Sequence, residues 1–494
     1  MVVLPLAVHG DEASSKNTLQ EVKASEILAK IKMGDPVEYS HVIVRGDLDL
    51  SKLDLPTKRV NRTLSNQIWG LSETSKIIVS PIKINDSSFD GFVSFSNAFF
   101  NEEIDFSDSN FTKDVSFIGA TFSGYADLGR AKFYGVADFK GTTFSGFANF
   151  VGATFIGYAE FTSAFIGYAQ FASATFSMPA SFFTTIFGEA NFMDITFRRY
   201  AQFTSATFSR EADFTSATFS EEADFMNANF WELAYFRGAI FNGIANFARS
   251  NFYGTANFES IEFSKDAILN EIEFRDITSF DNSQFNEKAL FENVIFKSKF
   301  SLNKTRYNKL YIRWYNIKDS VIYDDEAYMS LMKNFRDLGY FEDYDGCYFQ
   351  YRKEHRGQPW PLVNGVDEPI LKSIDFLLEW FYGYGTRPIN AIYFSIAIII
   401  VFGIFWRAIG LGGPDNVTGE DNDDWERPDD ILDILSFSAT VFLSGTRLFI
   451  DPPDLPRIRG RSRSLVKKSF TVERILGALF SILFFLAISR TVVR

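Results

Sequence analysis

The chain has 494 residues and a formal net charge of −13 at neutral pH, with 62 Asp and Glu against 49 Lys and Arg. This acidic balance argues against a nucleic-acid partner, because neutralising phosphates requires a basic surface. One cysteine excludes an internal disulfide framework, and the three scattered histidines offer no metal site. The length is that of roughly three domains. The unusual feature of the composition is its 57 phenylalanines.

The N-terminal region gives few structural signals. Residues 1–24 are mostly polar and irregular, and we expect them to be disordered. Their apolar start has no basic residue ahead of it and is too short for a secretory signal, so we expect a cytoplasmic location up to the first apolar span. A short helix is predicted over 25–33, and the alternation after residue 41 predicts short strands. We interpret residues 25–83 as a cap on the region that follows.

A repeat of eleven residues fills the range 84–300. Its phenylalanines recur alternately five and six residues apart, and an alanine lies two positions before many of them. Period-two alternation predicts extended backbone with Ala and Phe directed inward and the polar residue between them, such as Asp224, directed outward. Two repeats close one coil with four short sides, so that Phe203, Phe225 and Phe247 stack in one column. The range predicts roughly nine coils.

The repeat loses one residue twice, between Phe161 and Phe171 and between Phe182 and Phe192, where we expect a bulge or a kink. The order Ala, then Asp or Asn, then Phe resembles that of the pentapeptide-repeat proteins, in particular their eleven-residue variant. This resemblance implies a right-handed quadrilateral β-helix. The expected fold class is therefore mostly β, with an α-helical transmembrane domain after the β-helix. A fold of this kind implies no particular function.

Residues 301–358 are predicted to form a helical cap at the end of the β-helix. Asp324 can cap a helix that stops at Gly339, and a second helix is expected over 343–356. The aromatic stripe of this second helix, residues 348–352, either packs against its neighbours or couples the β-helix to the membrane domain.

Residues 359–387 are interpreted as a linker and an amphipathic interfacial helix, with the helix over 370–382 at a membrane surface. After it, Gly383-Tyr384-Gly385 spells the core of a potassium-channel filter. A filter follows a pore helix between two spans, whereas this triplet precedes the first span. We therefore interpret the triplet as a turn into the membrane helix.

The C-terminal region, 388–494, contains two strongly apolar segments, 388–406 and 475–489, as candidate membrane spans. Between them lies 434–446, which is apolar, rich in Ser, Thr and Gly, and too short to cross the hydrocarbon core, for which about 20 residues are needed. We predict a re-entrant pore loop, because a non-helical turn at membrane depth must line a watery cavity. Glu473 and Arg474 are interpreted as an interfacial pair.

Two spans around such a loop resemble the two-transmembrane pore-loop channels of the potassium-channel superfamily. The resemblance implies filter residues Ser438, Thr440, Ser444, Gly445 and Thr446, mouth residues Asp430, Asp433 and Asp451, and inner-helix residues Gly477 and Ser481. The family's Thr-Val-Gly-Tyr-Gly is replaced by Leu-Ser-Gly-Thr-Arg, so potassium selectivity is not implied. Gly477 is expected to bend the inner helix or to allow close packing, and Ser481 to face the lumen or a neighbouring helix.

Two features of this region leave alternatives open. The acidic stretch 415–433 is either a solvated loop or a set of carboxylates that concentrates cations at the mouth. A rival topology makes 431–450 a full third span. Its length and hydroxyl content favour the re-entrant loop, whereas the positive charges around the spans argue both ways.

No catalytic motif or cofactor site stands out, so we expect no enzyme. The first hypothesis is a multi-pass cell-membrane channel for inorganic cations with weak selectivity. It is assembled in the lipid bilayer from about four subunits, with the β-helix in the cytoplasm as a scaffold for a protein partner. The second hypothesis is a membrane-anchored interaction scaffold without conductance. A DNA-mimic topoisomerase inhibitor ranks third, because a membrane tail serves that role poorly.

Overall fold

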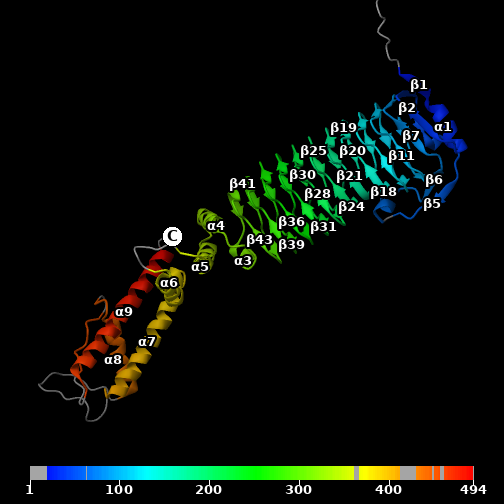
Figure 1. The fold of residues 1–494 in the computed structure, drawn as a ribbon. Coiled ribbons are helices and arrows are strands. Elements are labelled where there is room, and N and C mark those ends of the chain that lie inside the picture. The colour runs from blue at the N-terminus through cyan, green and yellow to red at the C-terminus, as the bar shows by residue number, and fades with distance from the viewer. Residues whose placement is uncertain are drawn as a thin grey trace, which may run out of the picture. The chain divides into compact units, whose positions relative to one another are not determined.

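The computed structural model describes residues 19–62, 64–360, 367–411, 430–447, 450–456 and 461–492. The chain divides into two compact units, Met1–Ala327 and Tyr328–Arg494. The first unit is mostly a β-solenoid, and the second is helical and contains two long apolar helices (Figure 1). This architecture confirms the predicted fold class, a mostly β coil followed by a helical region.

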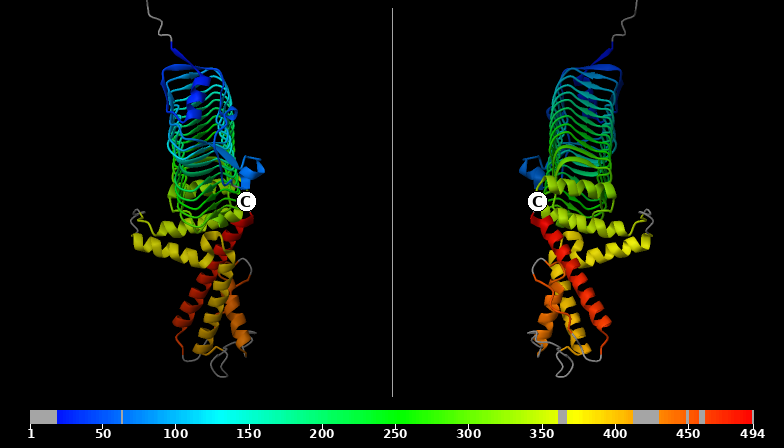
Figure 2. Two further views of the ribbon diagram at one scale, coloured as in Figure 1. Left: turned by 90° about the vertical axis from the view of Figure 1, so that its right-hand side faces the viewer. Right: turned by 90° about the vertical axis from the view of Figure 1, so that its left-hand side faces the viewer.

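Each coil of the solenoid has four short strands separated by corners. One coil consists of β27 (Thr207–Phe208), β28 (Ala212–Asp213), β29 (Thr218–Phe219) and β30 (Ala223–Asp224). Each of these strands pairs in parallel with the strand 22 residues further along, as Thr207 does with Asn229. The coils therefore stack in register, and Figure 2 shows the stack from two sides.

The solenoid is longer than predicted, with about 13 turns in the described residues instead of roughly nine. One ladder runs from β1 (Gln20–Lys23) through β3 (Val42–Arg45) to β44 (Arg306–Tyr311), beyond both ends of the range 84–300. The early coils use valine where later coils use phenylalanine, since Val22 pairs with Val44 and Val44 with Phe89. The spacing of phenylalanines in the sequence therefore does not reveal these coils.

Most strands between β8 (Ser88–Phe89) and β43 (Phe300–Ser301) have two residues. The strands longer than three residues are β1, β2 (Val37–Ser40), β3, β6 (Thr74–Ile78), β7 (Ile82–Asn85), β18 (Thr143–Asn149), β21 (Phe165–Gln170), β24 (Ile186–Asn191), β41 (Gln284–Leu290) and β44.

The interior of the solenoid is filled by columns of stacked phenylalanine rings. The ring centroids of Phe203 and Phe225 lie 4.7 Å apart with an interplanar angle of 2°, and those of Phe225 and Phe247 lie 4.8 Å apart. Rings of adjacent columns meet edge to face, as Phe203 and Phe214 do at 89°. All four side chains are fully buried. Each buried ring contributes on the order of 2 kcal/mol, so the columns dominate the stability of this unit.

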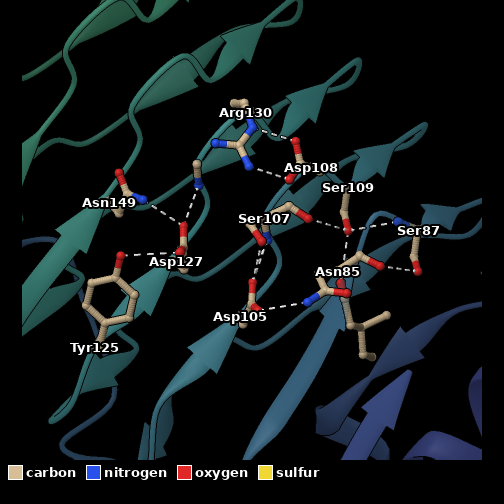
Figure 3. A network of polar contacts seen from close by, with 12 residues as sticks. Asn85, Ser87, Asp105, Ser107, Asp108, Ser109, Tyr125, Asp127, Arg130 and Asn149 are labelled. Carbon is tan, nitrogen blue, oxygen red and sulfur yellow. Dashed lines mark hydrogen bonds and ion pairs between the residues drawn. The ribbon is translucent and has the colours of Figure 1, made fainter. Parts of the chain in front are cut away.

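In many repeats the polar residue before the phenylalanine closes a corner with its side chain. Asp213 accepts a hydrogen bond from the backbone N–H of Thr215 at 2.8 Å, and the next residue, Ser216, has a φ of 57°. Asp127 does the same for the N–H of Gly129 (Figure 3). A positive φ is unfavourable for residues other than glycine, so this local hydrogen bond offsets part of the strain. Asp and Asn at this position therefore help to form the corner.

Asp224 stands at an outward position between the inward Ala223 and Phe225, but it is covered by side chains of neighbouring coils. It is only 8% exposed, and its carboxylate accepts hydrogen bonds from Thr204 Oγ1, Tyr200 Oη, Asn246 Nδ2 and the backbone N–H of the residue two positions on. The outward direction alone does not reveal this burial, because neighbouring coils bring donors to both carboxylate oxygens.

The missing residues of the repeat are absorbed at a corner. Between β18 and β21 the pairing changes from Phe144 with Ile166 to Phe147 with Tyr168, which is a shift from 22 to 21 residues. The full spacing returns between β24 and β28, where Ala190 pairs with Ala212. The bulge lies within the coils where the sequence predicts it. The phenylalanine columns continue through it without a break, since the centroids of Phe150 and Phe171 lie 4.7 Å apart.

The helices of the described residues are α1 (Ala24–Met33), α2 (Leu64–Ile68), α3 (Trp314–Ile317), α4 (Asp325–Asp337), α5 (Phe341–Arg356), α6 (Glu368–Tyr382), α7 (Pro388–Ile409), α8 (Ile431–Leu443) and α9 (Arg463–Val492), with short 3-10 turns at Leu50–Lys52 and Gly383–Gly385. Asp324 Oδ1 accepts the backbone N–H of Ala327 at 2.9 Å, and Gly339, with a φ of 74°, follows α4. Both ends of α4 therefore carry the signals expected from the sequence.

We predict that Phe225→Asp abolishes cooperative folding of the solenoid. The substitution places an unpaired carboxylate between two stacked rings, at a cost of several kcal/mol. Thermal unfolding of the full chain followed by circular dichroism measures the effect. Glu222→Gln, an exposed change in the same coil, is the control. An equal loss in both variants would contradict the assignment of the inward column.

We predict that Asp213→Ala lowers the free energy of unfolding by about 1 kcal/mol, because the corner N–H of Thr215 loses its acceptor. Asp213→Asn should be close to the wild type, since the amide oxygen accepts the same bond. Denaturant titration compares the two variants. Indistinguishable losses would show that the corner does not depend on this bond.

Candidate functional site

The helical unit contains two helices that are long and apolar enough to cross a membrane, Pro388–Ile409 and Arg463–Ser489, within the described residues. Their outward faces carry large apolar side chains that are 37–62% exposed: Ile392, Ile396, Ile400, Val401, Ile404, Ile475, Leu479, Ile482, Phe485 and Leu486. Such a surface is unfavourable in water. Together with the length and composition of the two helices, it suggests membrane association.

A shorter apolar helix, α8, packs against both of these helices (Figure 1). It has 13 residues and begins with a capping box, in which Asp430 caps the helix and Asp433 accepts the backbone N–H of Asp430. The helix ends before Ser444, and the chain then leads back to the end of the unit at which α9 begins (Figure 1). At 1.5 Å per residue, α8 is about 20 Å long, which is shorter than a hydrocarbon core of about 30 Å.

A buried carboxyl group connects the three helices. Glu473 of α9 is fully buried and accepts a hydrogen bond from Trp406 Nε1 of α7 at 2.8 Å. It also contacts Ser438 Oγ of α8, which lies 2.9 Å from the carbonyl oxygen of Ile399 in α7. The sequence interpretation pairs Glu473 with Arg474, whereas in the structure its carboxyl group lies in the contact of α7, α8 and α9. The sequence places this residue at the edge of an apolar run, and only the packing of α7 and α8 covers it.

Two glycines let the end of α8 approach α9 closely. A Cβ atom on Gly477 would lie 1.8 Å from the carbonyl oxygen of Phe442, and one on Gly445 would lie 2.2 Å from the carbonyl oxygen of Arg474. Neither distance is compatible with a side chain. Gly477 thus provides a close helix contact, one of the two roles that its sequence leaves open.

The hydroxyl groups predicted for the filter differ in what they contact. Ser438 and Ser444 are fully buried, and Ser444 Oγ donates to the carbonyl oxygen of Val441 at 2.7 Å. Thr440 Oγ1 donates to the carbonyl oxygen of Ser436 at 2.8 Å along α8. These bonds stay within the chain, so the two buried serines are not directed at a cavity.

The remaining predicted residues are spread over the unit. Thr446 is half-buried in the turn after α8, and Ser481 is half-buried on α9. Asp430 and Asp433 are exposed at the start of α8, where the capping box uses both, and Asp451 is exposed beyond its end. The acidic positions from 415 to 429 lie outside the described residues.

A second polar cluster joins α5 to α6 and to the turn after it. Asp375 of α6, which is 2% exposed, pairs with Arg352 and lies 3.6 Å from Arg356 of α5. Arg356 also pairs with Glu379 at 2.6 Å. Burial raises the pKa of the Tyr384 phenol, so this group keeps its proton and donates to Asp375 Oδ2 at 2.6 Å. The sequence predicts Gly383–Gly385 as a turn but does not predict that its tyrosine completes a buried ionic cluster.

This cluster is continuous with the apolar helices. Phe381 of α6 packs on Phe394 of α7 with ring centroids 5.1 Å apart, and on Phe480 of α9 at 5.0 Å. The helices α5, α6, α7 and α9 are thus linked by direct side-chain contacts within this unit. Arg352, which lies in the stripe 348–352, contacts α6 through its pairing with Asp375.

Among the residues that the structure describes, no group of three or more His, Cys, Asp or Glu side chains is arranged to hold a metal ion.

Comparison with known proteins identifies the solenoid. Residues 117–164 match the family model for pentapeptide repeats, described as nine copies. The match lies in the β-solenoid and supports the pentapeptide-repeat family for this region. Comparison with curated proteins gives no match, and comparison with solved structures gives none either. The family match lies within the solenoid, so it carries no information on the helical unit.

We predict that Gly477→Ala separates α8 from α9 and destabilises the helical unit by about 1–3 kcal/mol, because the new methyl group overlaps the carbonyl of Phe442. Thermal unfolding of the purified chain in detergent, followed by the fluorescence of buried Trp406, measures the change. Ser481→Ala, at a half-buried position of the same helix, should have little effect. Equal melting temperatures for the two variants would contradict the close contact.

Proposed function

We propose that the chain forms an ion-conducting pore in a membrane. The observation that carries this proposal is α8, an apolar helix of 13 residues placed between two helices that are long enough to span. A helix that enters a bilayer and returns leaves irregular backbone at membrane depth, which is tolerated where it lines a water-filled cavity. The turn at Ser444, Gly445 and Thr446 is the backbone that would line it.

The proposed pore requires several copies of the chain. Two spanning helices and one short helix cannot enclose a water-filled path, so we propose a homo-oligomer of about four subunits. The exposed apolar faces of α7 and α9 offer surface for lipid and for neighbouring subunits. Leu443 and Arg447 are exposed at the C-terminal end of α8. In the proposed assembly Arg447 lies outside the narrowest point, because the chain turns away after it through Asp451 and two prolines.

We propose cations as the permeant ions, with weak discrimination between potassium and sodium. The turn after α8 has one glycine and no aromatic residue, so it cannot supply the ladder of carbonyl groups that replaces the hydration shell of potassium. Asp430 and Asp433 at the start of α8, together with the acidic residues before them, would attract cations to the mouth. Arg447 opposes this choice, because a ring of arginines favours anions.

We further propose that the solenoid lies in the cytoplasm and acts as a regulatory or scaffolding rod. The path from Arg352 through Asp375 and Phe381 to α9 supports a regulatory role, since it links a cytoplasmic helix to a spanning helix.

A second candidate function is a membrane-anchored scaffold without conductance. It is favoured by Ser438 and Ser444, whose hydroxyl groups are buried and bonded within one chain. In this case α8 serves to hold α7 and α9 together, and the solenoid alone contacts partners.

We predict that the purified chain conducts in a planar bilayer under a potassium chloride gradient, with a reversal potential directed toward the potassium equilibrium potential. Thr446→Ala should change the conductance, because this hydroxyl lies in the proposed lining. Ser373→Ala, which removes an exposed hydroxyl from α6, should leave it unchanged.

Three outcomes would overturn parts of this proposal. A reversal potential close to the chloride equilibrium potential would show that anions permeate instead of cations. Arg447 would then be assigned to the pore lining. If the protein is shown to be inserted and oligomeric but no conductance is measured, the membrane-anchored scaffold replaces the channel as the proposed function. Equal effects of Thr446→Ala and Ser373→Ala would remove the turn after α8 from the conduction path.

A further inference from the structure

A cavity of about 340 Å³ lies between α5, α6 and the first turns of α7. Its wall includes Arg387, Asn390, Glu379, Trp380 and Tyr393. The cavity therefore combines one cationic group, one carboxylate, one amide and two large amphipathic aromatic side chains. None of these residues belongs to the pore proposed above.

The charges around this cavity do not cancel. Arg352 pairs with Asp375 and Arg356 pairs with Glu379, which uses both acidic groups of the cluster. Arg387 has no carboxylate partner in the described part of the chain. Its guanidinium instead stacks on the Phe349 ring, 4.0 Å from the centroid. The cavity thus keeps one positive charge, which an anion can neutralise.

The backbone makes room for this arginine. Gly383 has a φ of 58°, and a Cβ atom at this position would lie 2.9 Å from Cβ and Cγ of Arg387. The glycine of the turn therefore allows the arginine stem to pass beside it. A guanidinium fixed in this way, with its face on an aromatic ring, still presents N–H groups at its edge for two oxygen atoms.

The cavity lies at the N-terminal end of α7, and this position indicates which molecule supplies the anion. Arg387 immediately precedes Pro388, the first residue of a helix that is long enough to span. Trp380 and Tyr393 flank this helix start, and both residue types favour the headgroup layer of a bilayer. The most abundant anion at that depth is the phosphate of a phospholipid. This step rests on the proposed membrane location of α7.

We propose that this cavity binds the phosphate of an anionic phospholipid, with Arg387 as its ionic partner and Trp380 and Tyr393 against the glycerol region. Asn390 offers its side-chain amide as a further hydrogen-bonding group. Because α6 contacts α9 through Phe381 and Phe480, an occupied cavity also holds the inner face of α6 against that helix. The bound lipid would then stabilise α6, the helix that connects α5 to α7 and α9.

Quenching of tryptophan fluorescence by brominated lipids tests this proposal on the full chain. The chain is reconstituted into phosphatidylcholine vesicles with increasing fractions of phosphatidylglycerol that carries brominated acyl chains. We expect quenching to saturate at a low fraction and Arg387→Gln to raise the half-saturating fraction roughly tenfold, as for loss of a charge-assisted pair. Trp380→Phe should remove most of the saturable signal, which assigns it to the cavity.

Matched variants separate the cavity from general surface charge. Lys372→Gln removes a cation from α6 that already pairs with Glu368 at 2.7 Å, so it should leave the half-saturating fraction unchanged. Arg387→Lys keeps the charge and should retain part of the preference. Equal shifts in the Lys372 and Arg387 variants would overturn the proposal, as would identical quenching by brominated phosphatidylglycerol and brominated phosphatidylcholine.

Two further results distinguish the possible ligands and functions. Release of the brominated lipid by millimolar inorganic phosphate would overturn the lipid as ligand and assign the cavity to free phosphate. The assay involves no ion flux, so a saturable lipid signal in a protein that does not conduct would support the cavity and contradict the channel alone. Absence of quenching by any brominated lipid would contradict membrane insertion, and with it both proposals.

Discussion

A parallel β-ladder holds successive coils about 4.8 Å apart, and this distance nearly equals the separation of two stacked phenyl rings. Phe203 and Phe225 lie 4.7 Å apart in the solenoid, so backbone pairing and ring stacking are satisfied by the same repeat. This coincidence explains why one residue type fills the interior. It also explains why a lost residue is absorbed at a corner, as between Phe144 and Phe147, where no ring is displaced.

The helical unit is held together by different means. In the proposed membrane location, apolar helices gain little from burying one another, because lipid is as apolar as their side chains. The unit accordingly relies on close backbone contacts at Gly445 and Gly477 and on hydrogen bonds to the buried Glu473. The cluster around Asp375 connects α5 to α6 in the same manner, through paired charges. Both kinds of contact depend on a few residues, unlike the long phenylalanine columns.

Sequence periodicity predicts the solenoid because every coil repeats the same local environment. Its limit appears at Val22 and Val44, which occupy the inward column without the phenylalanine signature, so the first coils were not predicted as part of the ladder. The ends of α4 also follow from local signals. The environments of Glu473, Tyr384 and Asp224 could not be predicted, because each is created by segments that are distant in the sequence. The pore residues stay a prediction, since they depend on contacts between chains.

The solenoid grows by one coil for each 22 residues of chain, and each inner coil touches only the coils before and after it. Removing or adding one whole coil would therefore leave every remaining ring with a partner at the same distance. Such a change alters the length of the rod by about 4.8 Å and leaves its cross-section unaltered. The length of the solenoid therefore changes only in steps of one coil. A partner that binds both ends of it would measure the number of coils, and evolution can tune that span without redesigning a core.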